Sequence, residues 1–421
     1  MFVKQREWPT GVMSAMRENN HYDVVIIGAG IAGNALAVSL SGRGLSIALV
    51  EAQVAKSREA PDPSGVSGFD ARVSALTPNS RALFEQIQVW PGICEQRVCS
   101  YQHMVVWDGD GTAELQFDSG ELDVEALGYI AENTVIVNAL LNRVSSCADV
   151  SFFNPMRLEH CSVPESGVAE IILENGAQLT ADLLVAADGA LSRVRQILEF
   201  ETREWDYGHR AIVATVAVEQ PHQFTAWQRF LPSGPLAFLP LPDTDGRHYC
   251  SIVWSLDEAL VDPLLALSDA DFCQQLQQAF EGRLGAIEAC SKRFAFPLRQ
   301  RHAVEYVRNG VALVGDAAHT IHPLAGQGVN LGLQDVAVLA QEILSAHDKG
   351  LNCGQLETLK RYQRRRKGEN LAMMGAMDGF KRLFAERSLP IRWLRNAGMR
   401  TVGNYAPIKR QLMRHAMGIG R

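Results

Sequence analysis

An aspartate placed directly after a short apolar run is the first feature of this sequence that could carry chemistry. Residues 311–314 read Val-Ala-Leu-Val, and the run stops at Gly315 and Asp316. A short apolar run bounded by glycine is typical of a buried parallel strand. Because ligands of open α/β sheets bind beyond the carboxyl ends of the strands, this spacing predicts that Asp316 offers its carboxylate to a ligand.

A glycine-rich turn follows a few residues later and could bind the polar edge of a ring. The turn consists of Ala325, Gly326, Gln327 and Gly328. A helical pattern begins directly after it, at about Val329. The first turn of a helix presents backbone N–H groups without intrahelical acceptors, together with the positive end of the helix dipole. We therefore expect these N–H groups to face an anionic or polarised ring edge.

A second glycine motif lies near the start of the chain, within a strand-helix-strand pattern. Gly28, Gly30 and Gly33 form G-x-G-x-x-G after the apolar run 22–27. The next apolar run closes at Glu51, at about the 20-residue interval of dinucleotide-binding folds. In such folds the three glycines permit a tight turn, a close approach to a pyrophosphate and close helix packing, while the acid binds ribose hydroxyls. The alternative is a structural turn that binds no nucleotide.

A third acid follows an apolar run in the middle of the chain. The strand pattern that leaves the turn at Asn175 and Gly176 ends at Asp188 and Gly189. An adenosine diphosphate site at the first glycine motif, combined with a distant ring site, fits a dinucleotide with an extended second half. We therefore predict that the cofactor is FAD.

The elements that must position these residues predict an α/β protein with an inserted antiparallel sheet. The strand-helix-strand unit and the runs before Asp188 and Asp316 predict a Rossmann-like FAD-binding domain. Residues 210–256 instead alternate between proline turns, which indicates antiparallel strands of a substrate domain. After Asp335 the pattern is mostly helical. The predicted segments are a flexible extension at 1–20, the FAD-binding domain at 21–76, 126–195 and 291–375, the substrate domain at 77–125 and 196–290, and a basic helical C-terminal region at 376–421.

The net charge of −7 conceals a strong asymmetry. From Lys360 to Arg421 the chain has 16 basic and 3 acidic residues, a charge of +13, whereas the preceding residues have 24 basic and 44 acidic, a charge of −20. A basic tail suits an anionic membrane surface, an acidic partner or the acidic body of the protein itself. No nucleic-acid-binding motif accompanies the charge, so nucleic acid is not an expected partner.

Other features of the composition predict a cytoplasmic protein. The eight cysteines show no C-x-x-C spacing, which favours reduced thiols over zinc ligands or disulfides. The first 20 residues lack the apolar core of a signal peptide. The longest apolar stretch, 24–40, is punctuated by the glycines of the first motif, so we expect no transmembrane helix.

Three motifs in this order resemble those of the aromatic-ring flavoprotein monooxygenases. They are GAGIAG at 28–33, AADG at 186–189 and VGDAAHxxxPxxGQGxN at 314–330. The sequences ARVSALTPNS at 71–80, AENTVI at 131–136 and DAAHTIHPLAGQGVNLG at 316–332 resemble, more narrowly, the ring hydroxylases of ubiquinone biosynthesis. The resemblance extends from about residue 21 to residue 418.

This resemblance implies an FAD-dependent monooxygenase that hydroxylates a prenylated phenol or quinol. NADPH or NADH would reduce FAD, dioxygen would add at the flavin C4a carbon, and the hydroperoxide would transfer one oxygen atom to the ring. The implied partners are the prenylated substrate, a complex of ubiquinone-biosynthesis proteins, and an anionic membrane contacted peripherally through the basic C-terminal region. The protein would then work at the inner face of that membrane.

The resemblance also assigns roles to the candidate residues. In that family the Asp-Gly pair contacts FAD and the passing nicotinamide nucleotide, and the Gly-Asp pair holds the sugar chain of FAD. Arg72 is a candidate for the phosphate or ring region of FAD, with a structural salt bridge as the alternative. The candidate cofactor-binding residues are Gly28, Gly30, Gly33, Glu51, Arg72, Asp188, Gly189, Gly315, Asp316, Ala325, Gly326, Gln327, Gly328 and Asn330. No catalytic side chain and no metal ligand are predicted.

Two other groups of residues have competing interpretations. His319 and His322 form H-x-x-H, but without a helix or a third ligand we expect loop hydrogen bonding instead of metal binding. Four aromatic residues of the inserted sheet could line an apolar substrate pocket, although core packing explains each equally well. These residues are Tyr207, Trp227, Phe238 and Trp254.

Three other functions are compatible with the flavin motifs. The protein could hydroxylate a small soluble aromatic compound such as a benzoate, or it could be a non-catalytic FAD-binding scaffold of an enzyme complex. A flavin halogenase or prenyl reductase is the third, and the W-x-W-x-x-P motif of halogenases is absent from the sequence.

Overall fold

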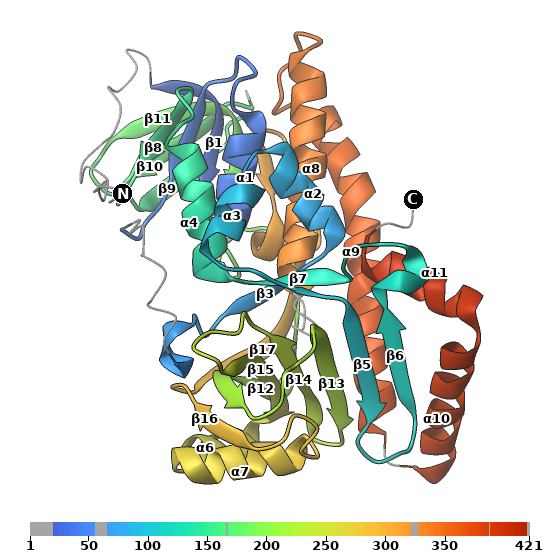
Figure 1. Ribbon diagram of the computed structural model, residues 1–421. Helices are drawn as coiled ribbons and strands as arrows, with labels where there is room; N and C mark the ends of the chain where they lie inside the picture. The colour runs from blue at the N-terminus through green and yellow to red at the C-terminus, as the bar shows by residue number, and fades with distance from the viewer. Residues whose placement is uncertain (1–19, 55–64, 166, 321–326, 387, 419–421) are drawn as a thin grey trace.

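Two large β-sheets, one above the other in Figure 1, organise the chain. The computed structural model describes residues 20–54, 65–165, 167–320, 327–386 and 388–418. At residues 207, 327, 380–382, 385, 389–392 and 394 only the backbone is described. Apart from residue 20, the predicted N-terminal extension lies outside the described residues.

The first sheet is the expected Rossmann-like sheet. Its strands run in the order β18-β19-β11-β1-β2-β8, and β1 pairs in parallel with both β11 and β2. The apolar runs become strands that are buried on both faces, as parallel sheets require. Its strands are β1 (His21–Ile27), β2 (Ile47–Val50), β8 (Val150–Phe153), β9 (Leu158–Ser162), β10 (Ala169–Leu173), β11 (Gln178–Ala186), β18 (Val307–Arg308) and β19 (Val311–Leu313). The predicted turn between β10 and β11 is confirmed, because the N–H of Gly176 donates to the carbonyl of Leu173.

Helices cover this sheet. The small-residue helix α1 packs against both α4 and α8. Thr77 caps α2 by accepting a hydrogen bond from the N–H of Ser80 at 3.3 Å. The helices on this side of the molecule are α1 (Ile31–Leu40), α2 (Pro78–Gln86), α3 (Trp90–Gln96), α4 (Asn133–Val144), α5 (Arg193–Ile197) and α8 (Gln327–His347).

The second sheet is the inserted one, and its order is β20-β17-β12-β15-β14-β13-β5-β6, with β16 beside β12. One face packs on α6 (Glu258–Leu265) and α7 (Asp269–Ala279), at the bottom of Figure 1. The other face packs on a small sheet of β3 (Val73–Leu76), β7 (Gly128–Glu132) and β4 (Cys99–Tyr101). The strands are β5 (His103–Asp108), β6 (Glu114–Asp118), β12 (Thr202–Val218), β13 (Thr225–Leu231), β14 (Gly234–Pro240), β15 (His248–Asp257), β16 (Ile287–Cys290), β17 (Phe294–Ala303) and β20 (His319–Thr320).

The aromatic residues proposed for a substrate pocket belong to a hydrophobic core. Phe238 stacks on Phe280 with ring centroids 3.8 Å apart, and the ring of Trp254 lies 6.3 Å from that of Phe272. Trp227 packs into the same cluster, on the side of α6 and α7. The pocket interpretation is therefore wrong for these three residues. Neighbouring residues of a strand point to opposite faces of the sheet, and these three side chains lie on the face that is directed away from the first sheet. The side chain of Tyr207 lies outside the described residues.

The predicted domain boundaries remain predictions, but the packing differs from them at two points. Residues 77–125 were expected in the substrate domain, yet Leu83 and Phe84 of α2 are buried in the core of the first sheet. Residues 291–375 were expected in the FAD-binding domain, yet β17 pairs with β12 in the second sheet. The chain crosses between the two sheets more often than local patterns reveal.

The C-terminal region is helical, as expected. Its helices are α9 (Leu356–Ala385), α10 (Leu389–Asn404) and α11 (Ala406–Ala416), and a proline lies in the first turn of each of the last two. The 3₁₀ turns of the chain are η1 (Val66–Gly68), η2 (Ser119–Leu122) and η3 (Gly315–Ala317). Within the described ranges, no helix has the length and apolarity needed to cross a membrane.

Candidate active site

Three predicted motifs meet at one edge of the first sheet. Strands β19, β11 and β1 are parallel neighbours, so their carboxyl ends point to the same side. Gly28 follows β1 with φ +103°, and a Cβ there would lie 2.5 Å from the carbonyl oxygen of Ala187. The turn after β1 therefore packs directly against the Asp188 segment, and only glycine fits at position 28.

The other two glycines of this turn have different surroundings. A Cβ at Gly33 would lie 1.8 Å from the carbonyl oxygen of Gly28, which excludes every other residue. A Cβ at Gly30 would meet no heavy atom within 4 Å. Gly30, at the start of α1, thus leaves open space beside backbone N–H groups, which is where a pyrophosphate would fit.

Glu51 ends β2 and lies beside the glycine turn. One carboxylate oxygen accepts a hydrogen bond from the N–H of Ala29 at 2.8 Å, and the other accepts one from the N–H of Gln53 at 2.8 Å. Each carboxylate oxygen can accept a second hydrogen bond. Glu51 is held in a fixed orientation and retains the lone pairs that ribose hydroxyls require.

Asp188 has a carboxylate oxygen without a partner. Its Oδ2 accepts hydrogen bonds from the N–H groups of Arg193 and Val194 at 2.7 and 3.3 Å. The buried Oδ1 has no hydrogen-bond partner within the described structure. Burial raises the pKa of this carboxyl, although the hydrogen bonds oppose that effect. A buried acceptor without a partner fits a ligand hydroxyl, and Gly189 leaves space beside it because a Cβ there would meet nothing within 4 Å.

Arg195 joins two of the motifs and was not predicted. Its guanidinium donates to the carbonyl of Ala190, after Asp188, and to the carbonyl of Ala317, after Asp316, both at 2.8 Å. The side chain is buried, and burial lowers its pKa, as does the nearby charge of Arg301. No local pattern in the sequence marks Arg195, because its partners are backbone carbonyl groups and one of them, that of Ala317, is 122 residues away in the chain.

Asp316 and Arg72 lie close enough for their charges to interact. Asp316 is exposed, but surrounding protein raises the pKa of its carboxyl by desolvation, while the charges of His319 and Arg72 oppose the rise. The guanidinium carbon of Arg72 lies 5.8 Å from the centre of the Phe296 ring. Arg72 thus lies beside both Asp316 and Phe296, and it forms no salt bridge with any residue that the structure describes. Gly315 has φ +57°, and a Cβ added there would lie 3.6 Å from both Ala32 Cβ and Gly332 Cα, so this backbone position beside α1 and α8 determines where Asp316 emerges.

The glycine turn before α8 is only partly described. Ala325 and Gly326 lie outside the described residues, whereas Gln327 and Gly328 form the first turn of α8. Their backbone N–H groups are those that a helix leaves without intrahelical acceptors. The side chain of Asn330 is buried and bonds to the carbonyl of Ala75 at 2.8 Å and the N–H of Thr77 at 3.0 Å. Asn330 thus holds α8 against β3 and α2, and its side chain points away from the open part of the site.

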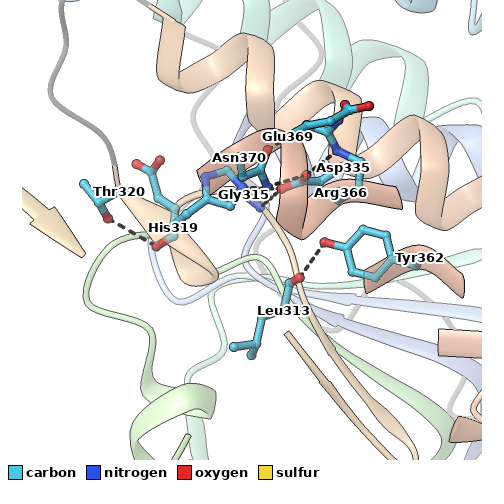
Figure 2. Close-up of polar contacts among 10 residues, drawn as sticks. Leu313, Gly315, His319, Thr320, Asp335, Tyr362, Arg366, Glu369 and Asn370 are labelled. Carbon is cyan, nitrogen blue, oxygen red and sulfur yellow. Dashed lines mark hydrogen bonds and ion pairs between the residues drawn. The ribbon is translucent and has the colours of Figure 1, made fainter. Parts of the chain in front are cut away.

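A fully buried carboxylate, Asp335, holds the site together (Figure 2). Its Oδ2 accepts hydrogen bonds from the N–H of Gly315 at 3.1 Å and from His319 Nε2 at 2.5 Å. Its Oδ1 accepts from Arg366 Nε at 2.8 Å and from Asn370 Nδ2 at 3.2 Å. One side chain of α8 therefore fixes the end of β19, the segment after Asp316 and the helix α9.

The charges around Asp335 keep it ionised. Burial alone would raise its pKa, but the charges and hydrogen bonds of His319 and Arg366 outweigh that effect and hold the pKa below its usual range. Asp335 was not among the predicted residues. Its position on the apolar face of a helical pattern, between Leu331 and Val336, could have indicated a buried and paired carboxylate.

His319 makes the hydrogen bond that was expected of it. It belongs to β20, and its ring is buried against Asp335. His322 lies outside the described residues. Among those that are described, no group of three His, Cys, Asp or Glu side chains could hold a metal ion.

A separate cavity of about 600 Å³ lies at the amino ends of β1 and β2. Asp149 lines it and accepts hydrogen bonds from the hydroxyl of Ser41 at 2.5 Å and the N–H of Gly42 at 2.6 Å. Its position at the opposite end of the strands separates it from the glycine turn and the strand-end acids.

Comparison with known proteins agrees with this geometry. Residues 21–374 match the family model described as FAD binding domain. The chain is 35% identical to 3-demethoxyubiquinol 3-hydroxylase of Escherichia coli (strain K12), over 95% of this chain and all of that protein. It is 32% identical to the human mitochondrial ubiquinone biosynthesis monooxygenase COQ6, over 98% of this chain and 95% of the relative. It is 35% identical to ubiquinone hydroxylase UbiL of Rhodospirillum rubrum, over 94% and 89%.

Solved structures share the fold. PqsL, a probable FAD-dependent monooxygenase from Pseudomonas aeruginosa, superposes with a TM-score of 0.75 at 22% identity, over 90% of this chain and all of that one. The p-nitrophenol 4-monooxygenase PnpA from Pseudomonas putida DLL-E4 gives a TM-score of 0.74 at 20% identity, over 95% and 98%.

The parallel sheet, the open glycine turn and the acids at its strand ends define an FAD-dependent monooxygenase of the aromatic-hydroxylase fold. The chain belongs to the FAD binding domain family and, within it, to the ubiquinone-biosynthesis hydroxylases.

The buried Asp335 predicts a large effect on stability. Asp335→Asn would remove the fully buried carboxylate that pairs with Arg366 and leave Arg366 only its partly buried partner Glu369, so we expect the free energy of unfolding to fall by about 3 kcal/mol. Because the pKa of Asp335 is depressed in the folded protein, its contribution is complete above about pH 4 and is lost as the pH falls further. Urea unfolding, followed by tryptophan fluorescence, should show the two proteins converging in acid.

The exposed Asp348, just beyond α8, provides the control for this measurement. Asp348→Asn should unfold within about 0.5 kcal/mol of the wild type. An Asp335→Asn protein that is equally stable would show that the network contributes little.

Asp316 predicts an effect on cofactor affinity. Asp316→Ala removes a charged hydrogen-bond acceptor from the edge of the sheet, so we expect the Kd for FAD to rise on the order of ten-fold to a hundred-fold. Titration of the apoprotein with FAD, followed by flavin fluorescence, measures this directly. Asp348→Ala is the matched control, and an unchanged Kd for the Asp316 variant would refute its assignment to the cofactor.

Proposed function

We propose that this protein hydroxylates the aromatic ring of a prenylated phenol or quinol intermediate of ubiquinone biosynthesis. The observation that carries the proposal is the full-length similarity to three proteins whose names state ubiquinol or ubiquinone hydroxylation or ubiquinone biosynthesis. The geometry supports it, because the sheet edge offers separate binding features for a nucleotide and for a ring. The prenylated ring, the reductant NADPH or NADH, and dioxygen are the substrates of this reaction.

The residues at the sheet edge fit FAD, each for a different chemical reason. Gly30 would leave the open approach that a pyrophosphate needs, and Glu51, oriented by the N–H of Ala29, would accept hydrogen bonds from the adenosine ribose. Asp188 would offer its unpartnered Oδ1 to a hydroxyl of FAD, and Asp316, at the neighbouring strand end, would bind the sugar chain that leads to the flavin. The first turn of α8 places N–H groups where negative charge on a ring edge is stabilised.

FAD, when bound, supplies the redox chemistry that passes electrons from a nicotinamide nucleotide to dioxygen and one oxygen atom to the ring. The chain itself positions the two rings and excludes water from between them. Asp335 fixes Gly315 and His319, and Arg195 fixes the segments after Asp188 and Asp316 relative to each other. These contacts keep the binding groups in register, which a transfer between two rings requires.

Turnover of defined substrates tests the proposal. We expect the purified holoenzyme to oxidise NADPH or NADH faster when a prenylated phenol or quinol is added, with hydroxylated ring as the product by mass spectrometry. A deletion strain should accumulate one under-hydroxylated prenylated ring. Turnover of soluble benzoates alone would indicate a hydroxylase of small aromatics, and no stimulation by any aromatic compound would indicate an FAD-binding scaffold.

We further propose that the enzyme docks on an anionic membrane through its C-terminal helices, because a prenylated substrate resides in the bilayer. The basic residues of this region divide into two groups. Arg395 is buried with Asp108 at 2.6 Å, and Lys409 pairs with Glu121, so these two neutralise the acidic body. Arg400, Arg410 and Arg414 are exposed instead. Contact with the acidic body of the protein, the alternative to membrane docking, therefore accounts for only part of the positive charge of the C-terminal region.

The outer face of α11 is apolar as well. Ile408 and Leu412 are 43% and 47% exposed, four residues apart on one side of the helix, while Met413 is buried against Leu127. Trp393 on α10 is 75% exposed. Exposed tryptophan and aliphatic side chains beside arginines are typical of helices that lie in a membrane interface.

Vesicle binding tests the docking proposal. Trp393→Glu and Leu412→Glu place a charge in the apolar contact, so we expect each to weaken binding to phosphatidylserine vesicles by about ten-fold in sedimentation assays. Leu351→Glu alters a leucine that is 46% exposed near the end of α8 and should bind like the wild type. Equal binding by all variants would refute the docking surface, and melting temperatures exclude misfolding.

A further inference from the structure

Two phenylalanines of β17 are exposed on the face of the second sheet that lies opposite α6 and α7. Phe294 and Phe296 are 38% and 39% exposed, whereas Ala295 between them packs into the core beside α7. Alternate residues of a strand point to opposite faces, so the two rings lie on the side of the first sheet and of β3. Their cross-strand neighbours on β12, Val213 and Ala211, share that face.

A third exposed ring lies further along the two strands, beyond the buried Leu298 and a register shift between Asp206 and Arg210 of β12. Trp205 of β12 is paired with Gln300 of β17, an even number of residues beyond Phe296, and is 47% exposed. Its ring stacks on His302 with centroids 5.8 Å apart. From Phe294 to Gln300 the strand spans about 20 Å. We name Phe294, Phe296 and Trp205 the aromatic strip.

The aromatic strip is continuous with the candidate active site. The guanidinium of Arg72 lies over the Phe296 ring at 5.8 Å, and the same guanidinium charge acts on the carboxyl of Asp316. Further along, His302 pairs with His319 across β17 and β20, and His319 bonds to Asp335. The strip thus runs beside the residues that position the cofactor, on the second sheet.

We propose that the aromatic strip binds the isoprenoid tail of the substrate and so selects prenylated rings over soluble ones. This inference rests on the proposed function, because it takes the substrate to be prenylated. An isoprenoid chain is long, apolar and devoid of hydrogen-bonding groups, so it binds to exposed apolar surface and not to polar anchors. Aromatic side chains arranged along a strand provide such a surface and lose little conformational freedom on binding. A soluble benzoate would have no use for a surface of this length.

The polar surroundings of the strip keep its rings in place without covering them. Lys292 Nζ lies 5.3 Å from the centre of the Phe294 ring, and Arg72 lies over Phe296. A cation over one face of a ring fixes the orientation of the ring. The strip therefore presents preorganised apolar surface, which lowers the entropic penalty of binding a flexible tail.

The test compares a tailed substrate with the same ring lacking its tail. The variants are Phe294→Ser, Phe296→Ser and the double variant, all as FAD-loaded enzyme. We expect kcat/KM for a phenol with several isoprene units to fall about ten-fold for each ring removed, because that is the order of affinity that buried phenyl surface provides. The values for the tail-free phenol should change less than two-fold. Phe294→Leu and Phe296→Leu keep the apolar surface and should retain most of the preference for the tail.

Phe224→Ser is the matched control, because Phe224 is 50% exposed in the turn between β12 and β13. It should leave both substrates unaffected. Equal losses for tailed and tail-free phenols would overturn the proposal in favour of a role in ring binding or folding. A raised Kd for FAD in the serine variants would assign the strip to the cofactor instead. Quenching of flavin fluorescence by a tailed phenol measures tail binding without turnover.

These readouts separate failure of this inference from failure of the proposed function. If the wild type hydroxylates the tailed phenol but the serine variants keep their preference for it, only the strip assignment falls. If the wild type hydroxylates neither phenol, the proposed function is refuted. If the wild type also binds the tailed and the tail-free phenol equally tightly, the assignment of the aromatic strip to tail binding is refuted as well.

Discussion

The buried carboxylate of Asp335 is the interaction on which the rest of the site depends. It is fully buried, and it receives hydrogen bonds from a backbone amide, a histidine, an arginine and an asparagine that come from three separate segments. Removing one partner of such a buried pair costs several kcal/mol because the remaining charge is left unpaired. The segment that presents Asp316 therefore has one well-defined position relative to α8 and α9. Without these hydrogen bonds, the backbone at Gly315, which has a positive φ, could adopt several conformations and would not hold Asp316 in one place.

The same carboxylate links the two halves of the molecule. Its partner His319 belongs to β20, which pairs with β17 of the second sheet, whereas Gly315 begins the turn that follows β19 of the first sheet. Arg195 adds a second connection by bonding carbonyls on both sides of the sheet edge. The edge of the first sheet proposed for the cofactor and the neighbouring strands of the second sheet are consequently held together by shared hydrogen bonds. This arrangement suits a reaction in which two rings must be aligned before an oxygen atom is transferred.

Local spacing in the sequence was sufficient to predict the glycine turn, Glu51 and the two strand-end acids, because each depends on a few consecutive residues and on the geometry of a parallel sheet. Asp335, Arg195 and Arg366 were missed because each has a partner that lies far away in the chain: His319 and Arg366 are 16 and 31 residues from Asp335, and Ala317 is 122 residues from Arg195. The alternation of the inserted strands was correctly identified, but alternation alone does not reveal which face meets the first sheet. Trp227, Phe238 and Trp254 were therefore considered for the pocket although they belong to the core, and the exposed rings of β17 were overlooked. The side chain of Asn330 shows a similar limit, since a motif position does not specify which way the side chain points.

The buried pair of Asp108 and Arg395 has a consequence for how the enzyme would meet its substrate. Arg395 also donates to the carbonyls of Leu383 and Phe384, so α10 is locked both to the end of β5 and to the end of α9. Separating the C-terminal helices from the body of the protein would leave a buried charge of this pair without its partner. The helices are therefore a rigid part of the protein and not a flexible attachment. An enzyme carried on a rigid arm keeps one orientation for as long as it stays on a surface. If these helices dock on a bilayer as proposed, the time that the enzyme stays bound would be set by dissociation of the whole molecule. While it is bound, the second sheet would keep one fixed angle to the lipid surface.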